Sequence, residues 1–187
     1  LMSTIQAFFE GKKQYFDGTV GEPLFIATDE SVKWDWQSYP IMHLDLNTQK
    51  YDSPESLDHM LDDFLCTQES IYGKRESEVG FGLRFQGVIE RAYKQTGSGV
   101  VILIDEYDKP LLQAIGNKEL QNEFRSTLKA FYGALKSMDG CIKFAFLTGV
   151  TKFGKVSVFS DLNNLEDMSM DPRFTTICGI TEEELHT

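Results

Sequence analysis

Two adjacent carboxylates, Asp105 and Glu106, are the residues of this chain best placed to do chemistry, because they directly follow a run of branched apolar residues. The run, Val100 to Ile104, reads VVILI and predicts a strand that is buried on both faces in a parallel sheet. Ligands of open α/β sheets bind at the carboxyl ends of the strands. Successive residues that leave a strand point in different directions, so one acid can hold a magnesium ion while the other orients an attacking water.

This order of residues is typical of P-loop enzymes, in which the first acid holds magnesium and the second polarises the water that attacks the γ-phosphate. A purely structural interpretation is also available, in which Asp105 and Glu106 cap backbone amides in the turn before Lys109 and Pro110. Polar strand ends are common, but five branched apolar residues followed by Asp-Glu are less so. We therefore favour the catalytic interpretation, with Asp105 as the metal ligand and Glu106 as the water-activating residue.

Thr148 is a second candidate, because it follows the next predicted strand, Ile142 to Leu147. If the two strands are neighbours, its hydroxyl emerges beside the acid pair, where a polar group can sense the γ-phosphate or the attacking water. A threonine before a glycine is equally typical of a strand-terminating turn, so the residues alone leave both roles open. Lys152 and Lys155 follow closely and are candidates to reach phosphate, although solvated surface lysines are the commoner case.

Two rival classes of protein stay open at this point. A metal-dependent phosphoesterase or nuclease would use Asp45, Asp105, Glu106 and Asp108 around one or two magnesium ions and would need no phosphate-binding loop. A non-catalytic regulatory or interaction module would keep the scaffold and use the acids only as structural caps. Nucleotide-dependent stabilisation of the protein separates an ATPase from such a module.

The composition is that of an ordinary globular protein, with 187 residues of which 41% are hydrophobic and 25% charged. The formal net charge of −11 repels phosphate backbones, so we expect no direct nucleic-acid binding. No apolar run approaches the ~20 residues needed to cross a bilayer, and the N-terminus lacks the features of a signal peptide. We therefore expect a cytoplasmic protein without a membrane partner.

Cysteines and histidines give little support for a disulfide framework or a dedicated zinc site. The cysteines lie far apart without C-x-x-C spacing, which favours reduced thiols. The histidines are equally scattered, and none stands at helical spacing from another histidine or a cysteine. These residues are Cys66, Cys141 and Cys178, and His43, His59 and His186.

Hydrophobic periodicity predicts helices and strands in alternation around the candidate residues. The predicted strands are Ile41 to Leu46, Val100 to Ile104 and Ile142 to Leu147. The predicted helices are Leu1 to Glu10, a helix that starts after Ser53 and carries an apolar stripe to Leu65, a helix that ends near Gly97, and Lys118 to Ser137. Ser53 is the expected N-cap of its helix, with a side chain that accepts a hydrogen bond from an otherwise unpaired amide.

The remaining segments carry weaker signals. Lys12 to Tyr39 is irregular and is expected to lie as a loop over the core, and Val156 to Phe159 is a short apolar segment. Thr181 and Glu184 form a capping box that predicts one more helix start. The uncapped helix at the beginning and this helix start at the end suggest one domain, residues 1–187, that is truncated at both ends.

Several motifs together resemble the AAA-ATPase-like family of predicted bacterial ATPases, whose members often carry a PD-(D/E)XK nuclease-like domain after the ATPase domain. The motifs occur in the family's order and span nearly the whole chain. They are YFDG, YPIMHLDLN, VVILIDEYDKPLL, FAFLTGVTKFGKVSVFSDLNNLEDMSMDP and CGITEEEL. Of these, IDEYDKP and LTGVTKF are specific signatures.

The resemblance implies a P-loop NTPase-like three-layer sandwich, in which a mainly parallel sheet is flanked by helices. It assigns Asp105 to the magnesium position of the Walker B motif, Glu106 to the water-activating position and Thr148 to the sensor position. It also implies Mg²⁺ and ATP as the cofactors of the intact parent protein. By this resemblance the chain is the ATP-binding and hydrolysing domain of an AAA-like ATPase.

One part of the family's equipment is missing, because no G-x-x-x-x-G-K-[ST] loop (Walker A) occurs in these residues. The resemblance places that loop and the first strand immediately before Leu1, so we expect a sheet that lacks this strand and a chain that is inactive alone. The loss would leave an unpaired edge on the strand Ile142 to Leu147. We expect that edge either to mediate self-association or to be covered by the tail of the chain.

Overall fold

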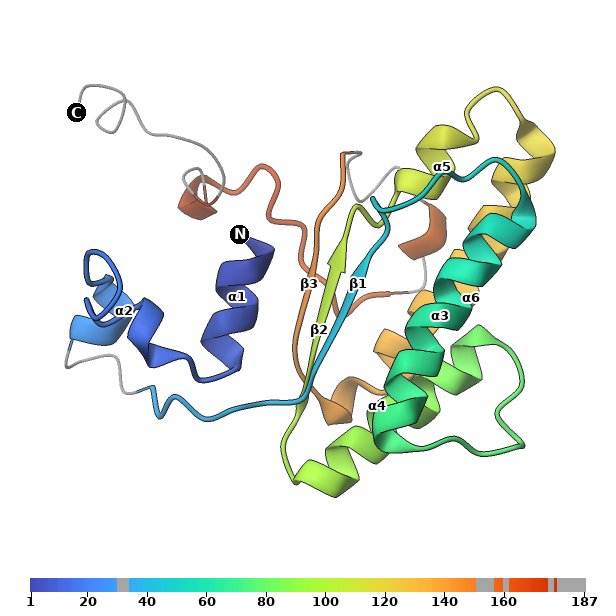
Figure 1. Cartoon of the computed structure of the whole chain (residues 1–187). Coiled ribbons are helices and arrows are strands. Elements are labelled where there is room, and N and C mark those ends of the chain that lie inside the picture. The colour runs from blue at the N-terminus through green and yellow to red at the C-terminus, as the bar shows by residue number, and fades with distance from the viewer. Residues whose placement is uncertain (30–33, 151–156, 160–161, 175–176, 178–187) are drawn as a thin grey trace.

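The structure is a computed structural model that describes residues 1–29, 34–150, 157–159, 162–174 and 177. Its centre is a small parallel sheet with helices packed on both faces (Figure 1). The chain therefore has the α/β architecture that the sequence predicts.

Within the described residues the sheet contains three strands, which lie side by side in chain order and run in the same direction. They are β1 (Ile41–Asp45), β2 (Val100–Asp105) and β3 (Ile142–Leu147). Asp45 of β1 lies in register with Asp105 of β2, and Leu147 of β3 lies in register with Ile104. The carboxyl ends of the three strands consequently meet at one edge of the sheet.

The helices predicted from periodicity are all present. They are α1 (Met2–Phe9), α3 (Pro54–Tyr72), α4 (Phe81–Thr96) and α6 (Lys118–Ser137). The prediction that the Ser53 side chain caps α3 is wrong, because that side chain accepts no amide hydrogen bond. Instead, the Ser53 carbonyl accepts hydrogen bonds from both the amide and the hydroxyl of Ser56, at 3.1 and 2.5 Å.

The described residues also contain short helices that the sequence did not predict. They are η1 (Lys13–Tyr15), α2 (Phe25–Thr28), α5 (Lys109–Gln113), η2 (Asp139–Cys141), η4 (Ser157–Phe159) and η5 (Pro172–Phe174). None is long enough to show an apolar stripe of helical period. Helix α5 begins directly after the turn that precedes Lys109 and Pro110, and proline is favourable in its first helical turn. The capping box at Thr181 and Glu184 lies outside the described residues.

Strand β2 is buried because helices cover both of its faces. Helices α3, α4 and α6 cover one face of the sheet (Figure 1). On that face Val100, Ile102 and Ile104 join a large core with these helices. On the other face Val101 and Leu103 form a smaller core with α1. The side chains alternate between the two cores as the period of a strand requires, which explains why the VVILI run contains no polar residue.

Helices α4 and α6, which lie over the large core, pack closely against each other. The rings of Phe85 on α4 and Phe131 on α6 stack with centroids 4.4 Å apart. One turn away, a Cβ added to Gly82 of α4 would lie 2.6 Å from the carbonyl oxygen of Ala130 on α6. Glycine is required there because the backbones of the two helices touch.

Residues 34–39, in the described part of the predicted loop, pack over the smaller core through aromatic rings, as predicted for this region. Trp34 stacks on Phe8 of α1 at 4.6 Å between centroids, and Tyr39 meets Phe9 edge to face at 5.8 Å. The helices η1 and α2 interrupt what the sequence predicted to be an irregular loop. Aromatic packing, rather than regular secondary structure, holds this segment against the sheet.

Within the described residues β3 pairs only with β2, so the outer edge of β3 carries no strand there. Self-association through this edge, or coverage by the tail, stays a prediction. No helix in the described part of the chain is long and apolar enough to cross a membrane.

Candidate functional site

Asp105, Glu106 and Thr148 come together at the carboxyl edge of the sheet, where the sequence predicted them. Asp105 is the last residue of β2 and Glu106 follows it, while Thr148 follows β3. Because β2 and β3 are parallel neighbours, their ends deliver both groups to the same place. All three residues are partly exposed, so a ligand can reach them.

The hydroxyl of Thr148 lies between the two acids. It donates a hydrogen bond to Oδ1 of Asp105 and accepts one from the backbone amide of Glu106 at 3.3 Å. The backbone of Thr148 is fixed as well, because its amide donates to the carbonyl of Ile104 at 2.9 Å and its carbonyl accepts from the amide of Tyr107 at 2.8 Å. The position of this side chain is therefore set by four hydrogen bonds to β2 and the residues just after it.

Glu106 adopts a left-handed backbone conformation, with φ of +55°. Residues other than glycine pay about 1–2 kcal/mol for this conformation, and such residues cluster at functional sites. The turn at Glu106 directs its amide to the Thr148 hydroxyl and its carbonyl to the amide of Lys109, at 2.9 Å. The strain thus accompanies the geometry that joins the acid pair to Thr148.

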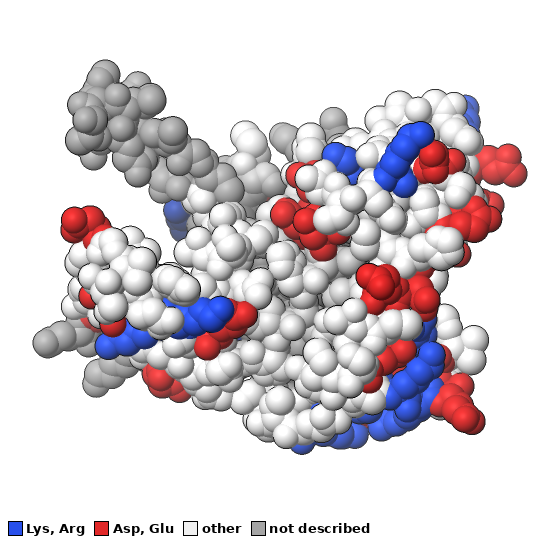
Figure 2. All heavy atoms as spheres, in the orientation of Figure 1, with Lys and Arg blue, Asp and Glu red and all other residues white. Residues whose placement is uncertain are grey.

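The acid pair has no basic counterion within the described ranges, where no ion pair reaches Asp105 or Glu106. The nearby Lys109 ammonium donates instead to Oδ1 of Asn47 at 2.9 Å. Acidic atoms gather on the surface where the strands end (Figure 2). This edge is suited to attract a cation, although the described residues contain no group of three or more potential metal ligands.

The four carboxylates of the nuclease hypothesis do not form one cluster. Asp108 is fully buried, and its Oδ1 accepts a hydrogen bond from the amide of Val150 at 3.2 Å. Asp45 ends β1 and accepts a hydrogen bond from the amide of Asn47 at 2.8 Å. Asp108 therefore serves the backbone after β3, which weakens the proposal of a metal site built from Asp45, Asp105, Glu106 and Asp108.

A buried aromatic cluster supports the turn after Glu106, and the sequence analysis missed it. The Tyr132 hydroxyl on α6 donates to the carbonyl of Tyr107 at 3.1 Å. The ring of Phe159 stacks on Tyr132 and meets Tyr107 edge to face, at 5.1 and 4.9 Å between centroids. Burial raises the pKa of the Tyr132 hydroxyl well above its usual value, so this hydroxyl stays protonated and keeps donating.

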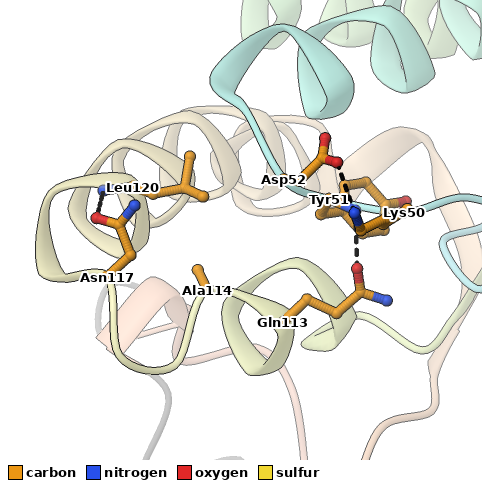
Figure 3. Close-up of a pocket in the computed structure, with 7 residues that line it drawn as sticks. All are labelled: Lys50, Tyr51, Asp52, Gln113, Ala114, Asn117 and Leu120. Carbon is orange, nitrogen blue, oxygen red and sulfur yellow. Dashed lines mark hydrogen bonds and ion pairs between the residues drawn. The ribbon is translucent and has the colours of Figure 1, made fainter.

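A hollow of about 490 Å³ lies beside the start of α6 (Figure 3), and the acid pair is not among the residues that line it. Its lining residues are Lys50, Tyr51, Asp52, Gln113, Ala114, Asn117 and Leu120. The polar groups there largely bind one another, since the amide of Tyr51 donates to Oε1 of Gln113 at 2.7 Å and Lys50 pairs with Asp52 at 2.9 Å. We assign no ligand to this hollow.

The other candidate residues are placed as follows. Cys66 and Cys141 are free thiols, and Cys178 lies outside the described residues. Nδ1 of His43 lies 3.3 Å from Oε1 of Gln6. Lys152 and Lys155 fall outside the described residues, so their proposed reach to phosphate stays a prediction.

Comparison with known proteins identifies the family. The sequence model of the AAA-ATPase-like family, described as predicted AAA-ATPases, matches residues 1–159. The chain belongs to this family. It is also 34% identical, over 179 residues, to a protein of Azotobacter chroococcum mcd 1 named "Uncharacterized protein in vnfD 5'region".

That alignment covers 95% of the chain and 34% of the relative, so the chain spans about a third of the relative's length. No solved structure matches the chain. The family membership agrees with the resemblance seen in the motifs, whereas a nuclease-like domain after the ATPase domain stays a prediction.

Proposed function

We propose that this chain supplies the magnesium-binding and water-orienting part of an ATP-hydrolysing site in the intact protein. The observation that carries the proposal is the hydrogen-bonded arrangement of Thr148 between the Asp105 carboxylate and the Glu106 amide. Membership of a family of predicted AAA-ATPases supports it. The parallel sheet with helices on both faces is compatible with the P-loop NTPase fold that we propose for the domain.

The residues at the edge suit a magnesium-bound nucleotide. The Thr148 hydroxyl donates to Oδ1 of Asp105, so Oδ2 is the oxygen that would hold a cation or its water ligands. Glu106 follows immediately and leaves the strand in another direction, which suits it to accept a proton from the attacking water. Magnesium, when bound, would neutralise charge that develops on the phosphate oxygens.

In this mechanism each residue of the chain has a separate task. Asp105 would hold the metal, and Glu106 would orient and deprotonate the water that attacks the γ-phosphate. Thr148 keeps the Asp105 carboxylate in place, and its position beside Glu106 lets it respond to the state of the γ-phosphate. The left-handed turn at Glu106 sets the relation between these groups before a substrate binds.

The triphosphate itself needs backbone amides and a lysine of a phosphate-binding loop, and the 187 residues contain no G-x-x-x-x-G-K-[ST]. We therefore propose that the chain alone binds ATP weakly and that turnover belongs to a protein that contains both parts. Experiments on activity should accordingly use the intact protein.

Glu106→Gln in the intact protein tests the proposal. The exchange keeps the size of the side chain and removes the proton acceptor, so we expect ATP turnover to fall by at least about a hundredfold while ATP binding is kept. Phosphate release measures turnover, and nucleotide-dependent thermal stabilisation measures binding. Glu76→Gln, an exposed acid in the loop between α3 and α4, is the matched control. Unchanged turnover in Glu106→Gln would overturn the proposed function.

A further inference from the structure

Asp108 is a fully buried carboxylate that the hydrolytic mechanism does not use directly. It lies three residues beyond the end of β2, and its Oδ1 accepts a hydrogen bond from the amide of Val150, 42 residues further along the chain. Burying a charged group is costly unless hydrogen bonds compensate. A role for its carboxylate in holding the chain after β3 accounts for this placement.

The chain after β3 passes so close to Asp108 that only glycine fits at position 149. A Cβ added to Gly149 would lie 2.7 Å from Oδ1 of Asp108 and 2.6 Å from Cε1 of Tyr107. Gly149 is itself exposed to solvent, so the restriction comes from one side only. The Tyr107–Asp108 pair therefore forms a surface against which the backbone just after Thr148 is pressed.

Hydrogen bonds on both sides of Tyr107 hold this surface in place. The amide of Tyr107 donates to the carbonyl of Thr148, and the carbonyl of Tyr107 accepts from the buried hydroxyl of Tyr132. Thr148 is thus tied to residues 104–107 on one side, and Val150 is tied to Asp108 on the other. The two ties lie on either side of Gly149.

We infer that Asp108 is a positioning residue for Thr148, which it acts on by fixing the backbone of Gly149 and Val150 against the turn after β2. The inference rests on the proposed function, because it gives Asp108 a task in the same site. Without the bond to Val150, the backbone after Thr148 is free to move away from β2, and the hydroxyl no longer stays between Asp105 and Glu106. Small displacements of an orienting group cost a large part of the rate.

Two substitutions disturb this tie without touching the acid pair or Thr148. Asp108→Ala removes the acceptor of the Val150 amide, and Gly149→Ala forces the backbone away from Tyr107 and Asp108. Each should lower kcat for ATP in the intact protein by about tenfold to a hundredfold, with KM unchanged. Asp108→Asn retains an oxygen acceptor and should keep most of the turnover. The Val150 amide should exchange its hydrogen faster in Asp108→Ala than in the wild type.

Glu69→Ala is the control for a general loss of stability. Glu69 is also a buried acid, but it lies on α3 and binds Arg84 of α4, away from the sheet edge. This variant should lower the unfolding midpoint without changing kcat or the exchange of Val150. A merely structural role for Asp108 predicts a lower unfolding midpoint and a wild-type kcat in Asp108→Ala, and that result would overturn the inference.

The outcomes separate this inference from the proposed function. If Glu106→Gln abolishes turnover while Asp108→Ala and Gly149→Ala leave it unchanged, the positioning role is wrong and the proposed function stands. If Glu106→Gln leaves turnover unchanged, the proposed function fails. In that case, unchanged exchange of the Val150 amide in Asp108→Ala would also refute the fixing of this backbone by Asp108. Should Asp108→Ala not fold, Gly149→Ala decides, and wild-type kcat in that variant refutes the inference.

Discussion

Two groups of acidic side chains in this protein differ in how their charge is compensated. Between α3 and α4, Arg84 lies among Glu69 and Asp62, and every acid of this group faces the guanidinium. At the carboxyl edge of the sheet, Asp105 and Glu106 stand side by side without a basic partner among the described residues. The charge of the first group is compensated within the protein, whereas the described residues supply no compensating cation to the second.

The geometry of the Arg84 group is that of a structural ion cluster. Arg84 binds Glu69 through two nitrogens, with Nε 2.7 Å from Oε1 and Nη2 3.0 Å from Oε2, and its Nη1 lies 2.6 Å from Oδ1 of Asp62. The hydrogen bonds from Arg84 hold the pKa of Glu69 and of Asp62 below their usual values. Glu69 raises the pKa of the Arg84 guanidinium in turn, so this cluster stays charged.

This difference in charge compensation shows that acidic residue types alone do not mark a functional site. A carboxylate that is paired with arginine stabilises the fold, and a carboxylate pair that is held without a counterion, next to a strained backbone, is available for a ligand. Removing a partner should therefore damage stability at the Arg84 cluster and activity at the sheet edge. The following predictions test that division.

Arg84→Ala should have the largest effect on stability. It leaves the buried Glu69 with only Lys74, whose Nζ lies 3.6 Å from Oε2, so the loss should approach the ~3–5 kcal/mol that breaking a buried pair costs. Urea unfolding followed by circular dichroism measures the loss. Arg75→Ala is the matched control, because Arg75 pairs with Glu90 at the surface and its removal should cost about 0–1 kcal/mol. Equal losses of unfolding free energy in the two variants would show that the Arg84 cluster stabilises the fold no more than a surface ion pair does.

Acid should lower the stability that this cluster provides, but by less than Arg84→Ala does. Protonation of Glu69 removes only the charge of the acid and keeps the Arg84 side chain in place. The folded-state pKa of Glu69 lies below the unfolded value, so its contribution is fully present above the unfolded pKa, about 4.3, and disappears as pH falls through the folded pKa. Urea midpoints measured from pH 6 down to pH 3 should fall less steeply in Glu69→Gln than in the wild type. Parallel curves would show that Glu69 is not a source of the acid sensitivity.

Glu106→Gly should have the smallest effect on stability and the opposite sign. Glycine relieves the left-handed strain at this position but gives the unfolded chain more freedom, so we expect a net gain of about 0.5–1 kcal/mol. ATP turnover of the intact protein should be lost in the same variant. Glu123→Gly, within α6, should instead destabilise by about 1 kcal/mol. A loss of stability in Glu106→Gly would show that the strain there is not a cost to folding.

The main elements and the neighbourhood of the acid pair could be predicted from the sequence. The branched run before Asp105 has only one stable placement, a strand covered on both faces, and parallel neighbours bring Thr148 to the same edge. Helix α5 was missed because a single turn leaves no periodic stripe. Whether Asp105, Glu106 and Thr148 perform the assigned chemistry stays a prediction.

Two features of the site lay beyond sequence reasoning for physical reasons. The left-handed turn at Glu106 accompanies a hydrogen bond to Thr148, 42 residues away, whereas the residue type itself disfavours this conformation. The burial of Asp108 depends on the amide of Val150, a partner 42 residues away that no local pattern reveals. The glycine after Thr148 was the one available signal, because it marks a close approach, and it was interpreted only as a turn.

The contact between Gly82 and the carbonyl of Ala130 also limits how the protein can vary. The two backbones are already in contact at this point, so α4 and α6 cannot come closer together. The contact therefore limits the volume available to side chains between these helices and the sheet. Core residues in that space, such as Leu128, can exchange only with side chains of similar volume. A family member with alanine at position 82 would hold α4 and α6 further apart and would need larger side chains deeper in the layer to fill the added space.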